Sequence, residues 1–130
     1  MSGPGEMRTP LARVRHLGAA RAGTEHFWQQ RLTSVALVPL SIAVVFIVTG
    51  LLGRNHAAVV QILGSPLVAI VMLLFIITSA YHMWLGMQVI IEDYVHDEKW
   101  KFLAIIGNTF FAIAIAAACV YSLLKISFGV

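Results

Sequence analysis

One ionisable side chain lies deep within an apolar stretch of this 130-residue chain. Four of the five histidines lie in the N-terminal region or in polar stretches, at positions 16, 26, 56 and 96, and the fifth is His82. His82 stands 11 residues before Asp93, about 16 Å along a helix that rises 1.5 Å per residue. An ionisable residue at such a depth in a membrane is costly and indicates a function. We therefore predict that His82 is a ligand; the alternative is a neutral histidine hydrogen-bonded to another helix.

The neighbours of His82 on a helix leave room for a flat group. At 100° per residue, one stripe of this helix carries Phe75, Ser79, His82, Gly86, Val89 and Asp93. A heme lying on a helix needs an imidazole nitrogen for its iron and a small residue where the ring passes, and Gly86 is one turn from His82. Gly86 could equally mark a tight helix–helix contact. A second histidine ligand would have to come from another copy of the chain or from another membrane subunit.

Two further positions could take part in redox chemistry at the membrane boundary. The phenol of Tyr94 can donate a hydrogen bond to a quinone carbonyl, and the adjacent Asp93 can help to deliver protons as the quinone is reduced. The alternatives are an aromatic belt residue for Tyr94 and a solvated helix end for Asp93. Arg31, at the start of the first apolar stretch, either anchors the chain by reaching to the interface or pairs with a carboxylate such as a heme propionate.

The composition excludes whole classes of protein. The chain is 59% hydrophobic and 12% charged, with a net charge of +3, whereas soluble domains are about 25% charged. So few charges cannot cover the surface of a soluble enzyme. The basic residues form no stripe interleaved with aromatic residues, so we expect membrane lipid and no nucleic acid as a partner.

The gaps between charged residues predict the elements that position these side chains. Uncharged stretches cover residues 32–53, 55–91 and 102–124, and a transmembrane helix needs about 20 apolar residues. Gly64-Ser65-Pro66 divides the longest stretch, because Ser65 suits a helix N-cap and Pro66 a first helical position. The sequence predicts an all-α membrane protein with three transmembrane helices, at about 31–52, 66–91 and 102–124.

The distribution of basic residues predicts an orientation. Residues 1–26 read as a basic tail without the apolar core of a secretory signal, and residues 27–130 as a three-helix membrane anchor domain. Seven Lys and Arg residues lie on the side of the tail and of the loop between the second and third helices, against two on the other side. Basic loops stay in the cytoplasm, so we expect a cytoplasmic N-terminus and a periplasmic C-terminus.

A family resemblance is carried by residues 82–95, which read His82-Met-Trp-Leu-Gly86-Met-Gln-Val-Ile-Ile-Glu-Asp93-Tyr94-Val. This stretch resembles the small hydrophobic membrane-anchor subunit of succinate dehydrogenase, respiratory complex II, in which a histidine, a glycine four residues later and an Asp-Tyr pair end the second of three helices. The segments Gly23-Thr24-Glu25-His26-Phe27-Trp28 and Arg31-Leu-Thr-Ser34 also look like bacterial members. The resemblance covers roughly residues 18–100.

The resemblance implies a shared heme b and a contribution to a ubiquinone site, without succinate chemistry on this chain. His82 would be one axial ligand of the iron, and a second anchor, of the cytochrome b556 type, would supply the other. Arg31 would lie near the heme propionates, with Ser79 and Gly86 along the ring. Tyr94 and Asp93 would line the quinone pocket.

The implied partners are this second anchor, an iron–sulfur subunit and a flavoprotein subunit, in a bacterial inner-membrane complex of the respiratory chain and the tricarboxylic acid cycle. Glu92 is a departure, because it places another carboxylate before the Asp-Tyr pair, and either Glu92 or Asp93 could relay protons. One alternative function is the anchor of another quinone-linked oxidoreductase, such as fumarate reductase. The other is a small transporter or scaffold subunit without heme.

Overall fold

A computed structural model describes residues 22–129, and all regular elements within this range are helices. They are α2 (Ala22–Leu51), α3 (His56–Leu63), α4 (Pro66–Tyr94) and α5 (Glu98–Phe128). Three of them are long and apolar enough to cross a membrane. The prediction of three membrane-spanning helices in an all-α protein is therefore confirmed in helix number and character.

Local sequence explains where the second and third long helices begin. Ser65 has the extended backbone of an N-cap residue, and Pro66 follows at the start of α4, as predicted. The hydroxyl of Ser65 donates to the carbonyl of Ile62 at 2.7 Å instead of capping α4. At α5, the carboxylate of Asp97 accepts hydrogen bonds from the backbone N–H groups of residues 99 and 100, which satisfies donors that a helix start leaves unpaired.

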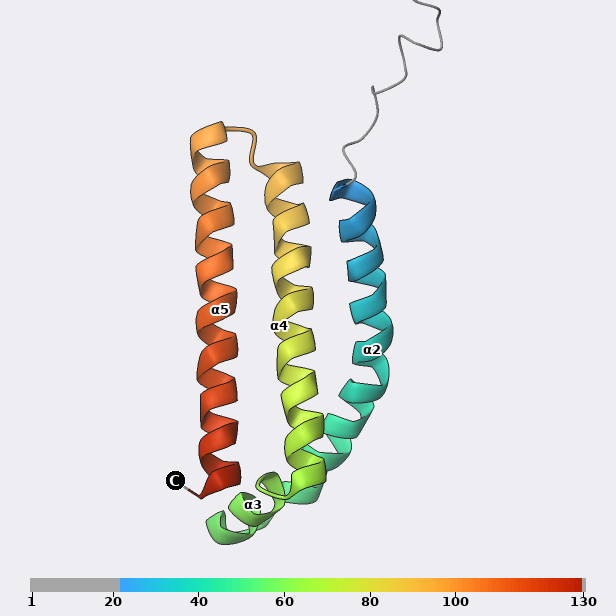
Figure 1. The fold of residues 1–130 in the computed structure, drawn as a ribbon, viewed down its shortest axis with the longest axis vertical. Helices are drawn as coiled ribbons and strands as arrows, with labels where there is room; N and C mark the ends of the chain where they lie inside the picture. The colour runs from blue at the N-terminus through green and yellow to red at the C-terminus, as the bar shows by residue number, and fades with distance from the viewer. Residues whose placement is uncertain (1–21, 130) are drawn as a thin grey trace, which may run out of the picture.

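The short helix α3 was not predicted. The side chain of Asn55 caps it by accepting a hydrogen bond from the N–H of Ala58 at 2.9 Å. Gly64 ends it. Eight residues rise only about 12 Å, too little to cross a bilayer, and α3 lies across one end of the long helices (Figure 1).

The three long helices form an open layer with α4 in the middle. It packs against α5 on one side and α2 on the other (Figure 1). Very few of the residues in 22–129 are buried within the chain itself: they are Leu85, Ile91, Asn108, Ala112 and Leu123. Large apolar side chains are exposed along all three long helices, which suits surfaces that contact lipid or other subunits.

The long helices extend beyond the spans predicted from the gaps between charged residues. The helix α2 already begins at Ala22, within the segment that we assigned to the tail. With 29 to 31 residues and about 1.5 Å per residue, each candidate span is longer than a hydrocarbon core of about 30 Å. The helices must therefore tilt, or their ends must project into the headgroup region.

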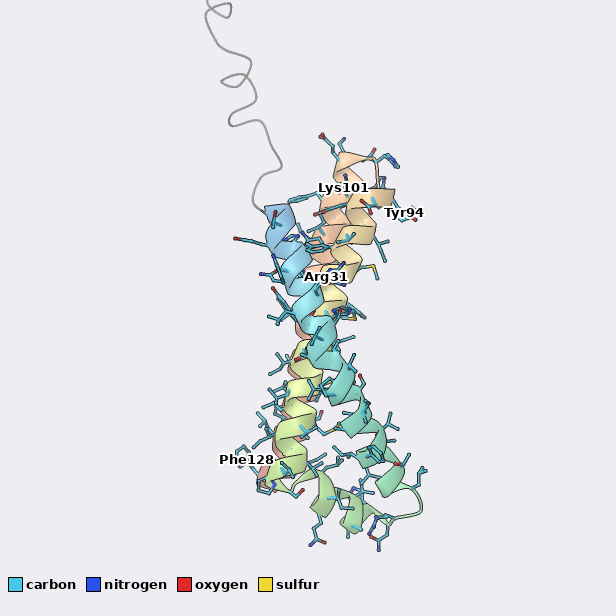
Figure 2. All side chains as sticks on the ribbon, turned by 90° about the vertical axis from the view of Figure 1, so that its right-hand side faces the viewer. Arg31, Tyr94, Lys101 and Phe128 are labelled. Carbon is cyan, nitrogen blue, oxygen red and sulfur yellow. The ribbon has the colours of Figure 1, made fainter. Side chains whose placement is uncertain are left out.

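The two ends of the layer carry different residues. Figure 2 shows Arg31, Tyr94 and Lys101 toward one end, where α2 begins, α4 ends and α5 begins; this is called the Tyr94 end. Phe128 lies toward the opposite end, the Phe128 end, together with α3 (Figures 1 and 2).

Candidate functional site

His82 faces α2, and its imidazole contacts two side chains there. The Nδ1 atom lies 2.8 Å from the hydroxyl oxygen of Thr33. The Nε2 atom lies 3.5 Å from the amide nitrogen of Gln30, at the outer limit for a hydrogen bond. His82 is half-buried. One ring nitrogen thus has a short partner, whereas the other has only a weak one.

Gln30 fills the space beside Gly86. A Cβ atom built on Gly86 would lie 3.5 Å from the amide nitrogen of Gln30. The amide oxygen of the same side chain is buried and has no hydrogen-bond partner within the described residues. A buried polar oxygen without a partner costs stability, and such groups mark places where a ligand, a water or another chain can complete the contact.

The remaining predicted heme contacts lie on both helices. Ser79 is half-buried on α4, about one turn before His82. Arg31 is exposed on α2, and its guanidinium carbon lies 4.5 Å from the centroid of the Phe27 ring. An open concavity of about 450 Å³ runs beside it, lined by Phe27, Gln30, Arg31, Ser34 and Val35. The guanidinium is therefore free to pair with an external carboxylate while Phe27 supports it.

The predicted quinone residues form a separate region at the end of α4. Tyr94 is 77% exposed and extends outward from the helix (Figure 2). Asp93 is exposed as well. Glu92 accepts a hydrogen bond of 3.1 Å from the amide of Gln88, one turn earlier on the same helix. Because Tyr94 is 12 residues beyond His82, the two positions are about 18 Å apart along α4.

A second polar contact joins α4 to α5. The indole N–H of Trp84 donates to the hydroxyl of Thr109 at 3.0 Å. The amide of Asn108 donates to the carbonyl of Trp84, also at 3.0 Å. Asn108 is 8% exposed and is the buried polar residue of the described range. This contact uses each of its donors within the chain.

Four residues in these contacts were not predicted from the sequence: Gln30, Thr33, Trp84 and Asn108. The available signal for the first two was their spacing, since polar residues three apart lie on one face of a helix. Residues 22–129 hold no group of three His, Cys, Asp or Glu side chains that could bind a metal ion.

Comparisons with known proteins agree with this architecture. Residues 5–117 match the family described as the succinate dehydrogenase/fumarate reductase transmembrane subunit. The chain is 31% identical over 121 residues to the succinate dehydrogenase hydrophobic membrane anchor subunit of Paracoccus denitrificans, with 93% of each chain covered. It is 32% identical over 108 residues to the subunit of the same name from Rickettsia bellii, covering 83% of this chain and 86% of that one.

A relative from Reclinomonas americana carries the shorter name succinate dehydrogenase membrane anchor subunit. It is 31% identical over 93 residues, which cover 69% of this chain and 78% of the relative. No solved structure matches the chain significantly.

Fold and comparisons together define a multi-pass helical protein of the bacterial inner membrane. The chain belongs to the family of succinate dehydrogenase/fumarate reductase transmembrane subunits, within which its relatives are membrane anchors of succinate dehydrogenase. The resemblance carried by residues 82–95 is therefore confirmed at the level of the family.

Proposed function

We propose that this chain anchors a succinate:quinone oxidoreductase in the membrane, binds heme b jointly with a second anchor subunit, and contributes to the quinone-reduction site. The observation that carries the heme proposal is the placement of His82 midway along α4, with Nδ1 held at 2.8 Å by Thr33 and Nε2 in weak contact only. Succinate oxidation itself belongs to other subunits of the complex.

The side chains around His82 fit a heme. A heme iron binds one imidazole nitrogen of a histidine ligand. Binding through Nε2 of His82 would break only the weak 3.5 Å contact with Gln30. Gln30 has rotatable bonds along its side chain and leaves a buried oxygen unpaired where it now lies. For a ring to lie against Gly86, the Gln30 side chain must turn away, and the concavity beside Arg31 offers room for that movement.

The residues of this chain would hold the heme and set its surroundings. When bound, the heme supplies one-electron redox chemistry. His82 holds it through the imidazole, and Arg31 pairs with a propionate by charge-assisted hydrogen bonds. Because His82 is half-buried between α2 and α4, its contact with the heme would be partly shielded from water, which strengthens electrostatic contacts.

The exposed Tyr94 supports the quinone proposal. Its hydroxyl donates a hydrogen bond to a quinone carbonyl and so positions the headgroup at the membrane boundary. Either Glu92 or Asp93 holds the proton that the reduced quinone takes up. The amide of Gln88 already donates to Glu92, whereas Asp93 is exposed beside Tyr94.

The proposed orientation places the Tyr94 end in the cytoplasm. Arg31 and Lys101 lie toward this end (Figure 2), and the N-terminal region adds further arginines. The Phe128 end carries Arg54 and Lys125. Because basic residues are retained on the cytoplasmic side, the iron–sulfur and flavoprotein subunits would dock at the Tyr94 end. The C-terminus would then lie in the periplasm.

His82→Ala in the purified complex tests the heme proposal. We expect the reduced-minus-oxidised absorption spectrum to lose its heme b signal, because the iron loses a ligand on this side. His56→Ala is the matched control, since His56 is exposed at the start of α3, and its spectrum should equal that of the wild type. An unaltered heme signal in His82→Ala would exclude His82 as the ligand and would favour a scaffold or transporter role.

The family also includes fumarate reductase subunits, which favours one alternative: the complex could run in the direction of fumarate reduction. Measuring succinate:quinone reduction and quinol:fumarate reduction with the same purified complex distinguishes the two. We expect succinate:quinone reduction to dominate, in line with the names of the relatives. Faster fumarate reduction would reverse the assignment.

A further inference from the structure

The hydroxyl of Thr33 lies within hydrogen-bond distance of three atoms but carries only one hydrogen. Its oxygen lies 2.8 Å from the carbonyl oxygen of Gln29 and 3.1 Å from that of Gln30, both on its own helix. It also lies 2.8 Å from Nδ1 of His82 on α4. A threonine hydroxyl donates one hydrogen and accepts through two lone pairs, so the direction of each contact can be assigned.

Only one assignment satisfies all three contacts. The two carbonyl oxygens can only accept, so the hydroxyl hydrogen points toward them. If the hydrogen pointed at His82 instead, oxygen atoms 2.8 Å apart would face each other with no hydrogen between them. The hydroxyl therefore accepts, and the Nδ1–H of His82 donates to it. A neutral imidazole protonated at Nδ1 carries its free lone pair on Nε2.

The contact on the other ring nitrogen agrees with this tautomer. The amide nitrogen of Gln30 can only donate, and it lies 3.5 Å from Nε2 of His82. An unprotonated Nε2 attracts this donor, whereas a protonated one would repel it. Both contacts from α2 thus indicate the same state of the ring, with Nε2 as the available ligand atom.

We propose that Thr33 is a positioning residue for His82: its hydroxyl accepts the Nδ1–H, and so holds the imidazole in the tautomer and orientation in which Nε2 can bind the heme iron. This inference rests on the proposed role of His82 as a heme ligand. Histidine ligands of metals commonly donate their other N–H to a protein acceptor, which fixes the ring and raises its basicity as a ligand. Here that acceptor comes from α2, so α2 would help to bind heme without ligating it.

Two substitutions at one position isolate the hydroxyl. Thr33→Val keeps the branched shape of the side chain and removes the acceptor, whereas Thr33→Ser keeps the hydroxyl. Thr49→Val is the matched control, because Thr49 is an exposed threonine of the same helix whose hydroxyl bonds to the carbonyls of Val45 and Phe46 on that helix. Each variant complex is purified, and two properties are measured: the rate at which heme passes to excess apomyoglobin, and the midpoint potential of the heme.

In Thr33→Val we expect heme loss to accelerate on the order of 10-fold or more, the usual effect of removing such an acceptor. The midpoint potential should rise, because a less basic imidazole stabilises oxidised iron less. Thr33→Ser and Thr49→Val should stay close to the wild type in both properties. A purely structural role for Thr33 would not shift the potential and would not depend on the hydroxyl.

The outcomes separate this inference from the proposed function. Wild-type heme retention and potential in Thr33→Val, while His82→Ala loses its heme, would overturn the role of Thr33 and leave His82 as the ligand. Equal heme loss in Thr33→Val and Thr33→Ser would also overturn it, because the loss would then follow packing. Heme retained in His82→Ala would overturn the proposed function itself.

Discussion

The contact of α4 with α5 contains two short hydrogen bonds between side chains and backbone of the two helices. Trp84 and Thr109 pair through the indole N–H and a hydroxyl at 3.0 Å, and the amide of Asn108 donates to a backbone carbonyl of α4. These groups find their partners inside the chain, whereas the amide oxygen of Gln88, one turn after Trp84, is buried without a hydrogen-bond partner among the described residues. Such hydrogen bonds between membrane helices contribute about 0.6 kcal/mol on average and at most about 1.7 kcal/mol.

The contact of α4 with α2 leaves one ring nitrogen of His82 with only a weak partner. His82 has one short bond, to Thr33, and one contact of 3.5 Å, to Gln30. The amide oxygen of Gln30 is buried without a hydrogen-bond partner in the described part of the chain.

The two faces of α4, one toward α5 and one toward α2, therefore have different roles. The face toward α5 holds the chain together through the contacts of Trp84 with Thr109 and Asn108, each at 3.0 Å. On the face toward α2, the Nε2 atom of His82 has only a 3.5 Å contact. This suits the binding of a group supplied from outside the chain. Substitutions on the two faces should therefore affect different measurements.

Arg31→Leu should have the largest effect among the tests of this comparison, because a charge-assisted hydrogen bond contributes about 1.5–3 kcal/mol. We expect heme to be lost at least about tenfold faster to apomyoglobin, since 1.4 kcal/mol corresponds to a factor of 10. Arg54→Leu, at the Phe128 end, is the control and should keep its heme. Equal heme retention in both variants would mean that Arg31 acts only as a topological anchor.

Tyr94→Phe should have an intermediate effect. It should change neither the heme contacts on the α2 face of α4 nor the packing on its α5 face. Loss of one neutral hydrogen bond of about 1 kcal/mol predicts a roughly fivefold slower reduction of quinone. Succinate oxidation with a soluble dye acceptor should continue at the wild-type rate, and so should the heme spectrum. Tyr121→Phe removes an equally accessible hydroxyl, 67% exposed on α5, and should change neither activity. If both activities fell together in Tyr94→Phe, Tyr94 would act through assembly of the complex.

Asn108→Ala should have the smallest effect and should change stability alone. It removes the bond to Trp84, so we expect a loss of about 0.6–1.7 kcal/mol, measured as earlier thermal unfolding of the purified complex. The heme spectrum should not change. Ser122→Ala is the control, because Ser122 is exposed and bonds only to its own helix. A heme signal lost in Asn108→Ala would erase the distinction between the two faces.

The sequence alone determined the number of spanning helices and singled out His82. Charged residues cannot stay in hydrocarbon, so the gaps between them mark the spans regardless of how the helices pack. The boundary at Ser65-Pro66 was also local, since it depends on the backbone preferences of those two residues. The depth of His82 also follows from the sequence, because it depends only on the number of residues between His82 and the end of its helix.

Only the tertiary structure decided which side chains meet His82. Thr33 and Gln30 lie 49 and 52 residues away in the chain, and their contacts depend on how α2 is rotated and shifted against α4. An apolar sequence does not fix that rotation, because in lipid almost every face of a helix is hydrophobic and close packing selects the partner. The middle position of α4, the pairing of Trp84 with Thr109 and the unpaired oxygen of Gln30 all follow from that packing.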